Sequence, residues 1–373
     1  MGKTLRPLKS LLAVLEELPD PRVARSREHE LSDLLVIAVC ALLVGGESFY
    51  DMADFGQARE AWLRTFLRLP NGIPSHDTFN RLFQALDPGA FAEAFATWTQ
   101  GLRAGRGPEV VALDGKAARR AVDAGRSPRH LVSAWATESG LTLGQLQVAE
   151  KSNELTAVPA LLRQLELAGC IVTADALHCQ KAVAREITEA DADYVLALKG
   201  NHATVHGEVR ADLDDALARQ EPALAVLTTV EKGHGRIETR RYWQTEAIGW
   251  FADRAEWPGL RSVGVVEATR EVGDKVSTER RYYLSSLPAD LPRFAQAVRG
   301  HWAIENQCHW VLDVVFGEDQ SRARAGHAVA NLGLARRLAL NLLRQDHSLQ
   351  RGLHRKQLHA ALNPDYLAKL LPF

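Results

Sequence analysis

Three carboxylates in this 373-residue chain follow patterns that could support metal chemistry. Asp114 and Asp175 each end an apolar run, at 110–113 and 170–174, and Glu305 lies on a predicted late helix. Carboxylate oxygens suit Mg²⁺ or Mn²⁺. Three acids in one site would repel each other unless cations neutralised them, and two ions about 4 Å apart could support displacement at a phosphodiester. A strand-end Asp is also a common turn former or helix cap, so position alone leaves both interpretations open.

The helix that carries Glu305 has a second interpretation. Ionisable residues recur on it every four positions, at His301, Glu305, His309 and Asp313. Zinc could use His and Glu at this spacing, but the His-Glu-x-x-His motif is absent. The alternative treats the two histidines, with Trp302 and Trp310, as packing and hydrogen-bonding residues of a half-buried helix.

Cysteine usage and the apolar segments predict a cytoplasmic chain outside the membrane. The four cysteines, Cys40, Cys170, Cys179 and Cys308, are widely spaced and indicate buried, reduced thiols. Cys170 and Cys179 flank Asp175, but their offset fits no common metal-ligand spacing. The longest apolar run, 34–46, has 13 residues, whereas about 18 to 20 are needed to span a bilayer. The opening MGKTLRPLKS does not indicate secretion.

Basic residues gather in three regions although the net charge is only -1. The first follows Asp114 and contains Lys116, Arg119, Arg120, Arg126 and Arg129. The second has Arg236, Arg240 and Arg241 beside two aromatic residues, and the third, 321–373, holds nine Lys or Arg against two Asp. Such groups could hold nucleic-acid phosphates without reading sequence. A solvated loop, a solvated helix face and cross-strand packing are the alternatives.

Other common chemistries lack their motifs. Seven residues instead of four separate Gly107 from the Gly115–Lys116 pair, which rules out a P-loop at that place. Neither G-x-G-x-x-G nor G-x-S-x-G occurs. Nucleotide-cofactor and serine-hydrolase functions therefore lose their main support.

The element pattern predicts a helical region followed by a mixed α/β region. Helices are expected at 34–44, 48–68 and 77–100, and a boundary falls at 105–108. Strands and helices then follow in the order strand, strand, strand, helix, strand, helix, strand, at 110–113, 130–137, 141–149, 153–167, 170–174, 179–190 and 194–198. We expect the first and fourth strands to lie side by side at the centre of the sheet.

The rest of the chain is predicted to be β-rich and then helical. Alternating segments at 225–245 and 262–285 follow a polar helix at 202–220, and a long helix is expected at 291–316. These patterns divide the chain into four segments: 1–104 helical, 105–201 the first part of the core, 202–288 a β-rich insertion, and 289–373 a catalytic helix with a basic helical region.

Several sequence motifs together resemble one family. They are LPDPR (18–22), LPNGIPSHDTFNRLF (69–83), LDGK (113–116), HLVSAW (130–135), EKSNE (150–154), IVTADALHCQKA (171–182), YVLALKGN (194–201), KGHGRIETR (232–240) and RGHWAIENQCHWVLDVVFGED (299–319). The chain is similar to bacterial insertion-sequence transposases of the DDE type, in the ISAs group that includes the H-repeat-associated proteins. The resemblance covers nearly the whole chain.

This resemblance implies a fold and a metal site. The expected fold class is α/β, a ribonuclease-H-like core with a β-rich insertion behind an all-helical N-terminal domain. Asp114, Asp175 and Glu305 match the family's three acids, which bind two Mg²⁺ or Mn²⁺ ions and cut, then join, DNA strands. Related transposases often carry Tyr, Arg and Lys around the Glu, whereas this chain has Val298, His301 and Leu312 there.

The resemblance also implies partners. They are double-stranded DNA, both the element's terminal inverted repeats and the target, and further copies of the chain in a homodimer or higher multimer. The expected DNA-binding residues are Lys116, Arg119, Arg120, Lys199, Arg236, Arg240, Arg299 and His301, the last two replacing the family's basic function. The N-terminal helices and the basic tail are expected to bind element ends.

Two other functions remain open at this point. A domesticated or degenerate relative could act as a nuclease that cuts DNA without joining it. A relative that has lost catalysis could bind element ends and only occupy or repress them. The intact set of three acids counts against this second alternative.

Overall fold

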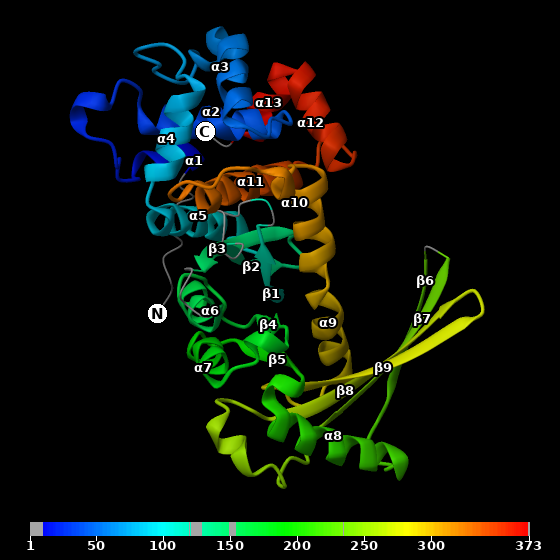
Figure 1. Cartoon of the computed structure of the whole chain (residues 1–373). Helices are drawn as coiled ribbons and strands as arrows, with labels where there is room; N and C mark the ends of the chain where they lie inside the picture. Colours follow the sequence, from blue (N-terminus) through cyan, green and yellow to red (C-terminus); the bar gives the residue numbers. More distant parts are fainter. Residues whose placement is uncertain (1–9, 119, 121–128, 149–153, 234, 372–373) are drawn as a thin grey trace. The chain divides into compact units, whose positions relative to one another are not determined.

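The computed structural model describes residues 10–118, 120, 129–148, 154–233 and 235–371. It divides into two compact units (Figure 1). Unit 1 comprises Met1–Arg106, Gly115–Ala157 and Ile304–Phe373, and unit 2 comprises Gly107–Asp114 and Val158–Ala303. Each unit is therefore assembled from separate stretches of the chain. The four-segment division made from the sequence stays a prediction about modules, since compactness groups segments by their packing.

Unit 1 is mainly helical and contains one β-hairpin. Its elements are α1 (Leu11–Glu16), η1 (Ala24–Ser26), α2 (Leu31–Leu43), α3 (Phe49–Leu63), α4 (His76–Ala85), α5 (Pro88–Arg103), β2 (His130–Ala136), β3 (Leu141–Val148), η5 (Ile304–His309), α10 (Trp310–Val314), η6 (Glu318–Gln320), α11 (Ala328–Gln345), α12 (Leu353–Leu362) and α13 (Pro364–Leu370). Two further elements, β1 (Val110–Ala117) and α6 (Glu154–Leu162), cross from one unit into the other.

Helix α11 is the central element of unit 1. Every residue from Ala328 to Leu343 is buried, and the helix contacts α2, α4, α5 and β3. Two asparagines connect it to its neighbours. Asn331 Nδ2 donates to the carbonyls at the end of α4, and Asn341 exchanges two 2.9 Å hydrogen bonds with the backbone of Thr142 in β3. Part of the segment expected to be a basic surface, 328–345, is therefore a core helix.

Unit 2 is built on a sheet. Besides β1, its elements are β4 (Ile171–Ala174), η2 (Ala176–His178), α7 (Lys181–Glu189), β5 (Asp193–Leu198), η3 (Gly200–His202), α8 (Ala203–Ala218), β6 (Leu227–Gly233), β7 (Arg236–Thr245), η4 (Ala252–Glu256), β8 (Ser262–Val272), β9 (Lys275–Ser285) and α9 (Leu291–His301). Its strands lie in the order β1-β4-β5-β9-β8-β7-β6.

Strands β1, β4 and β5 pair in parallel, whereas the following strands pair antiparallel. The apolar runs are buried, as expected of parallel strands. The register places Leu113 opposite Ala174. The prediction that the first and fourth strands are neighbours is thus confirmed, and so is the mixed α/β fold class.

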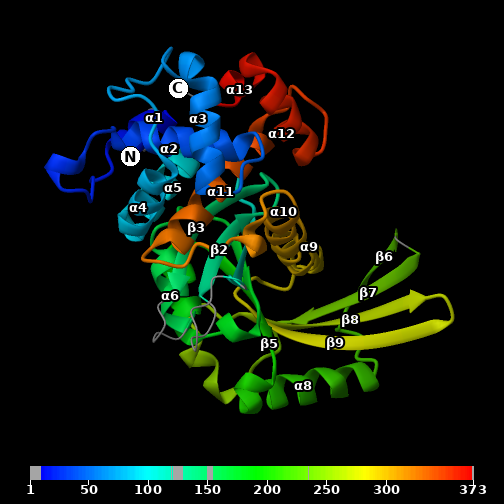
Figure 2. The same ribbon diagram turned by 45° about the horizontal axis from the view of Figure 1, so that its top comes forward.

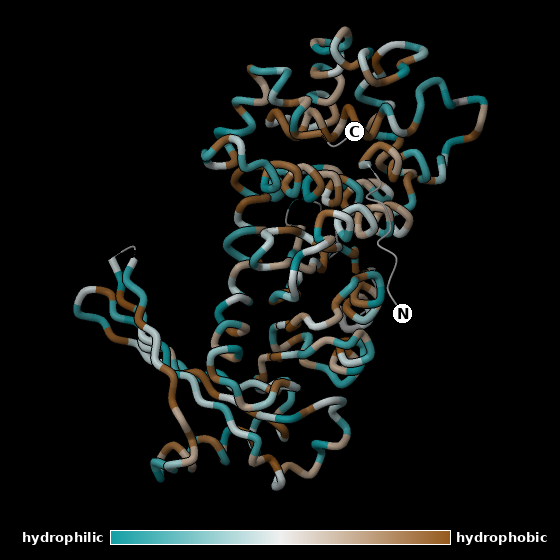
Figure 3. The backbone as a smooth tube through the Cα atoms, turned by 180° about the vertical axis from the view of Figure 1, so that it is seen from behind, coloured by the Kyte–Doolittle hydropathy of each residue, from teal (hydrophilic) through white to brown (hydrophobic). Residues whose placement is uncertain are grey.

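The antiparallel strands β6 to β9 continue beyond the core of unit 2 as two hairpins (Figure 2). The outer part of β8 and β9 is exposed, while Val263, Val265 and Leu284 nearer the core are buried. In Figure 3 this projecting part shows mixed hydrophilic and hydrophobic colours. Helix α8 contacts β8 and β9, where Asp214 accepts hydrogen bonds from Arg280 and Tyr282. These strands lie within the segment 202–288, which the sequence predicts to be β-rich.

The long helix expected at 291–316 is interrupted. Helix α9 ends at His301, and Ile304–His309 form a π-helical segment before α10. A π turn bonds residue i to i+5 and changes the direction of the side chains that follow. Trp310 is consequently 59% exposed, so its expected packing role is wrong. Within the described ranges, no helix is both long enough and apolar enough to cross a bilayer.

The core of unit 2 generates the first prediction. An added Cβ at Gly264 would lie 2.5 Å from the ring of Phe294, which is fully buried between Tyr242 and Tyr283. Because that ring has little room to move, Gly264→Ala should lower the free energy of unfolding by about 1–3 kcal/mol in urea titrations. Gly207→Ala on α8 meets open space and should be neutral or stabilising by up to about 1 kcal/mol. Equal effects of the two substitutions would contradict the packing argument.

Candidate active site

Two of the three candidate acids follow the paired part of neighbouring strands in unit 2: Asp114 lies inside β1, and Asp175 comes directly after β4. Asp114 and Asp175 each come one residue after the last paired residues of β1 and β4, Leu113 and Ala174. Adjacent strands are about 4.8 Å apart, and residues at the same level of parallel strands share a face. The register therefore places the backbones of Asp114 and Asp175 at neighbouring positions in the sheet. Both residues are partly buried.

The carboxylate of Asp175 also has a local structural role. It is the N-cap of η2, where Oδ1 accepts a 3.2 Å hydrogen bond from the backbone N–H of His178. Asn201 Nδ2 donates to the carbonyl of Ala176 at 2.6 Å and further fixes this turn. The helix-cap interpretation is thus correct for one oxygen. Capping with one oxygen orients the carboxylate, and it is compatible with ligand binding by the group.

His301 approaches the same two acids from α9. Its Nδ1 lies 3.1 Å from Thr173 Oγ1, two residues before Asp175 and on the same side of β4. Burial lowers the pKa of His301 below its ordinary value, although the charges of Asp114 and Asp175 oppose this shift. The imidazole is therefore neutral at pH 7 and lacks the charge expected of a phosphate-binding group.

Glu305 belongs to unit 1, where it is exposed near the start of the π-helical segment. Two contacts hold this segment: Cys308 Sγ lies 3.7 Å from Thr142 Oγ1, and Arg344 donates to the carbonyl of Gln307. The predicted four-residue stripe does not persist, because Glu305 is exposed whereas His309 is buried. Across the described residues, no three His, Cys, Asp or Glu side chains are grouped as a preformed metal site.

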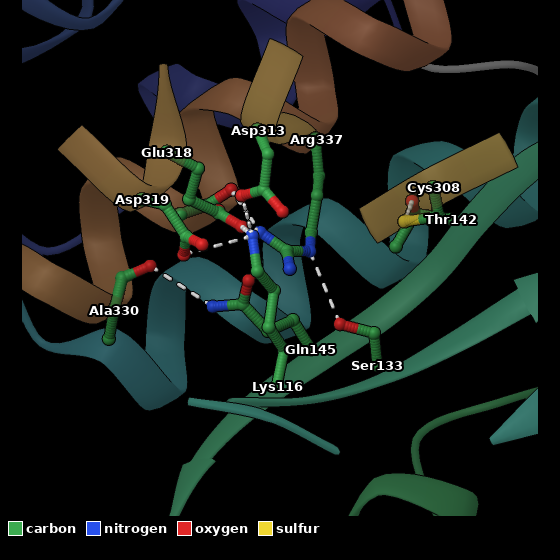
Figure 4. Close-up of polar contacts among 11 residues, drawn as sticks. Lys116, Ser133, Thr142, Gln145, Cys308, Asp313, Glu318, Asp319, Ala330 and Arg337 are labelled. Carbon is green, nitrogen blue, oxygen red and sulfur yellow. Dashed lines mark hydrogen bonds and ion pairs between the residues drawn. The ribbon is translucent and has the colours of Figure 1, made fainter. Parts of the chain in front are cut away.

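Lys116, expected to bind DNA, is instead enclosed by acids of unit 1 (Figure 4). Its ammonium pairs with Asp313, with Glu318 at 3.0 Å and with Asp319 at 3.5 Å. The side chain is only 12% exposed. Three carboxylates already surround the ammonium, so a phosphate would have to compete with them, and the contact of Lys116 with DNA stays a prediction.

A buried arginine completes this cluster, which we define as Lys116, Asp313, Glu318, Asp319 and Arg337. Arg337 Nη1 lies 2.7 Å from Glu318 Oε1, and its Nε donates to Ser133 Oγ at 3.2 Å. Burial would raise the pKa of Glu318, but the charges of Arg337 and Lys116 outweigh it and hold the pKa well below its ordinary value. Glu318 is therefore an ionised, buried carboxylate between two cations.

The other expected DNA-binding residues fall into two groups. Arg120 and Lys199 are exposed, whereas Arg119 lies outside the described residues. Arg299 forms two 2.8 Å hydrogen bonds with Glu231, and Arg240 pairs with Glu231 and Glu238. Arg236 lies 4.0 Å from Glu238 and is partly exposed.

The basic tail is only partly a surface. Arg336 and Arg337 are almost fully buried, and Lys356 Nζ donates to the carbonyl of Leu343 at 2.9 Å. These three cations are used within the fold, which corrects the expectation of a uniform phosphate-facing face. The sequence interpretation also missed the cluster acids, although Asp313, Glu318 and Asp319 crowd into the short LDVVFGED stretch after Glu305.

The cluster generates a stability prediction. Glu318→Gln keeps the side-chain shape but leaves Arg337 and Lys116 without their shared buried anion. Breaking one partner of a buried ion pair typically costs about 3–5 kcal/mol. We expect a loss of this size in the free energy of unfolding from urea titration. Glu93→Gln, an exposed change on α5, should alter it by at most about 0.5 kcal/mol. A Glu318→Gln loss as small as the control's would rule out a stabilising role.

The same carboxylate predicts a pH dependence. Because the folded-state pKa of Glu318 is depressed, its stabilising contribution is complete above the unfolded-state pKa, near 4.3. That contribution is lost as the pH falls below this value toward the folded-state pKa. The stability difference between the wild type and Glu318→Gln should therefore be constant from about pH 5 to 8 and shrink below about pH 4. A difference that grows on acidification would contradict this assignment.

Two family models match the chain. The DDE_Tnp_1-associated model matches residues 12–99, and the model of the transposase DDE domain matches residues 105–342. The first match coincides with the helical N-terminal region. The second contains Asp114, Asp175 and Glu305 as well as the whole cluster.

Similar proteins agree with these matches. An uncharacterised protein in the dhlA 3′ region of Xanthobacter autotrophicus is 47% identical over 74% of this chain and 94% of its own length. The H repeat-associated putative transposase YhhI of Escherichia coli K12 is 35% identical over 98% of both chains. A piggyBac transposase in a synaptic complex with hairpin DNA gives a TM-score of 0.42 at 10% identity, covering 97% of this chain and 79% of that one, too low to support an argument. With one model matching more than half of its length, the chain belongs to the DDE transposase family.

Proposed function

We propose that this protein catalyses cutting and joining of DNA at the ends of its own insertion sequence. The observation that carries the proposal is the parallel register of β1 and β4, in which Asp114 and Asp175 each come directly after the last pair of opposite residues. Membership of the DDE family supplies the reaction class. Glu305 is proposed as the third acid because it lies in the matched domain and in an exposed π-helical segment.

The donors present fit magnesium or manganese. Asp114 and Asp175 offer carboxylate oxygens, which Mg²⁺ and Mn²⁺ prefer, and Glu305 adds a third carboxylate in the proposal. The cap on Asp175 Oδ1 fixes the direction of that carboxylate before any ligand binds. Two bound divalent ions would lower the pKa of a nucleophilic water or hydroxyl and stabilise the oxygen that leaves phosphorus. Thr173 orients His301, which as a neutral ring adds no repulsion toward such cations.

The proposed reaction has two phosphoryl-transfer steps. Water attacks the phosphorus at the element end, the P–O3′ bond breaks, and the leaving oxygen takes up a proton to give a 3′ hydroxyl. That hydroxyl then attacks a phosphorus of the target, releasing a target 3′ hydroxyl as a new phosphodiester forms. The three acids hold the same groups in both steps, so one site serves cutting and joining.

Exposed cations supply the proposed DNA contacts. Arg120 lies six residues after Asp114 and is exposed, and exposed Lys199 follows β5, the strand beside β4. Arg236 and Arg299 are already paired with glutamates, so a phosphate must compete with those carboxylates. We propose that the active form is a multimer that joins two element ends, and that it binds double-stranded terminal repeats and target DNA.

Substitution of each acid tests the proposal. Asp114→Asn, Asp175→Asn and Glu305→Gln should each lower Mg²⁺-dependent cleavage of element-end DNA by about 10³-fold, because ion binding contributes several kcal/mol to the transition state. DNA affinity should be retained. Glu208→Gln, an exposed change on α8, should cut like the wild type. Near-normal cutting by one of the three variants would remove that residue from the mechanism.

Paired assays separate the alternative functions. Supplying DNA with a pre-cut 3′ hydroxyl tests joining alone, and uncut DNA tests hydrolysis. Cleavage without joining by the wild type would favour a nuclease. Metal-independent binding without any cleavage product would favour a non-catalytic DNA-binding protein.

A further inference from the structure

The chain enters unit 1 at two places beside proposed acids. It enters once at Gly115, directly after Asp114, and again at Ile304, directly before Glu305. Whatever joins these two entry segments inside unit 1 also constrains the residues next to them. The cluster around Lys116 makes such a connection.

Lys116 connects the two entry segments directly. It lies two residues after Asp114 on the continuous strand β1, and Asp313 lies on α10, which follows the π-helical segment that carries Glu305. The ammonium of Lys116 pairs with Asp313 and with Glu318 just beyond α10. One lysine therefore links the strand that leaves Asp114 to the helical segment that carries Glu305.

The acceptors of Lys116 are themselves fixed. Glu318 is 6% exposed at its side chain and is held by Arg337, which is fully buried. Arg337 in turn bonds Ser133 on β2 and the carbonyl of Gly333 on α11. Figure 4 shows the carboxylates of Asp313, Glu318 and Asp319 around the ammonium of Lys116. Through Glu318 and Arg337, the lysine is thus anchored to the β-hairpin and to the central helix of unit 1.

A flexible residue makes this anchor necessary. Gly115 separates Asp114 from Lys116, and glycine restricts the backbone less than any other residue. Without the ion pairs, the strand end after Asp114 would lose its main polar attachment to α10 and η6. The part of β1 that follows Asp114 would then be held less firmly within unit 1.

We propose that Lys116 is a positioning residue that ties the part of β1 following Asp114 to α10 and η6 within unit 1, without itself contacting DNA. The proposal rests on the metal-dependent function proposed above. Its role is geometric, since the charge of the ammonium is already matched by carboxylates inside unit 1.

Lys116→Met in the full-length protein tests this role. We expect kcat for cleavage at saturating DNA to fall about 10- to 100-fold, as for loss of a group that orients a metal ligand. The Mg²⁺ concentration for half-maximal cleavage should rise about tenfold. The Kd for element-end DNA and its salt dependence should stay within about twofold of wild type. Lys181→Met, which removes a lysine from an exposed pair with Glu256, is the matched control and should leave all three unchanged.

A second variant separates positioning from folding. Lys116→Met/Asp313→Leu removes the lysine and one of its three acidic partners, so it should recover part of the stability lost by Lys116→Met in urea titration. The tie between the segments is still absent, so cleavage should stay impaired. Recovery of cleavage together with stability would reduce Lys116 to a folding role. A weaker Kd with a smaller salt slope in Lys116→Met would instead show a phosphate contact and overturn the proposal.

Metal binding gives a readout that does not require cleavage. Mn²⁺ binding to the DNA-free protein, followed by electron paramagnetic resonance, should weaken about tenfold in Lys116→Met and remain normal in Lys181→Met. If the wild type binds Mn²⁺ but never cuts element ends, the proposed function fails while this comparison still decides the positioning role. Equal Mn²⁺ affinity in Lys116→Met and wild type would overturn it.

Discussion

The parallel pairing of β1 with β4 is the constraint on which the proposed chemistry depends. Four register pairs end at Leu113 and Ala174, and Asp114 within β1 and Asp175 after β4 come directly after the last pair. A shift of one residue in this register would move one acid along its strand and turn it to the other face. Two buried apolar runs therefore determine the positions of the two acids that we propose as metal ligands.

The surroundings of the two acids are arranged to limit competing charge. His301 contributes a neutral ring held by Thr173, because burial lowers its pKa. Lys116, the nearest cation along the chain, is directed into its own carboxylates. The acids at the strand ends are thus not neutralised by this lysine. In such an environment, divalent cations are the partners that best relieve repulsion between carboxylates.

Much of the core arrangement could be predicted from the sequence. The apolar runs before Asp114 and Asp175 were recognisable as strands because both end in turn-forming polar residues, and their adjacency followed from connection rules. The buried cations could not be predicted. Arg337 and Lys116 look like surface charges, since their partners Glu318 and Asp313 lie about 20 and 200 residues away along the chain. Charge counting assigns a residue to a region, whereas burial depends on tertiary contacts.

The π-helical interruption at Glu305 could not be predicted from sequence periodicity either. Residues 291–316 have a helical pattern throughout, and a π turn differs from an α turn by a single hydrogen-bond shift. Its supports are Thr142 on β3 and Arg344 at the end of α11, both distant in sequence. The positions of Glu305 and Trp310 therefore depend on contacts that no local pattern contains.

The discontinuous composition of unit 1 has a consequence for biosynthesis. Helix α2 needs α11 to cover its apolar surface, but residues 328–345 leave the ribosome almost 300 residues later. At about 5–20 residues per second, the part of α2 that α11 covers stays exposed for roughly 15–60 s, while α1 and α3 can already pack against the helix. The nascent chain must therefore rely on chaperones or on temporary contacts during that interval. Truncation before α11 should accordingly yield an aggregation-prone polypeptide and not a smaller folded protein.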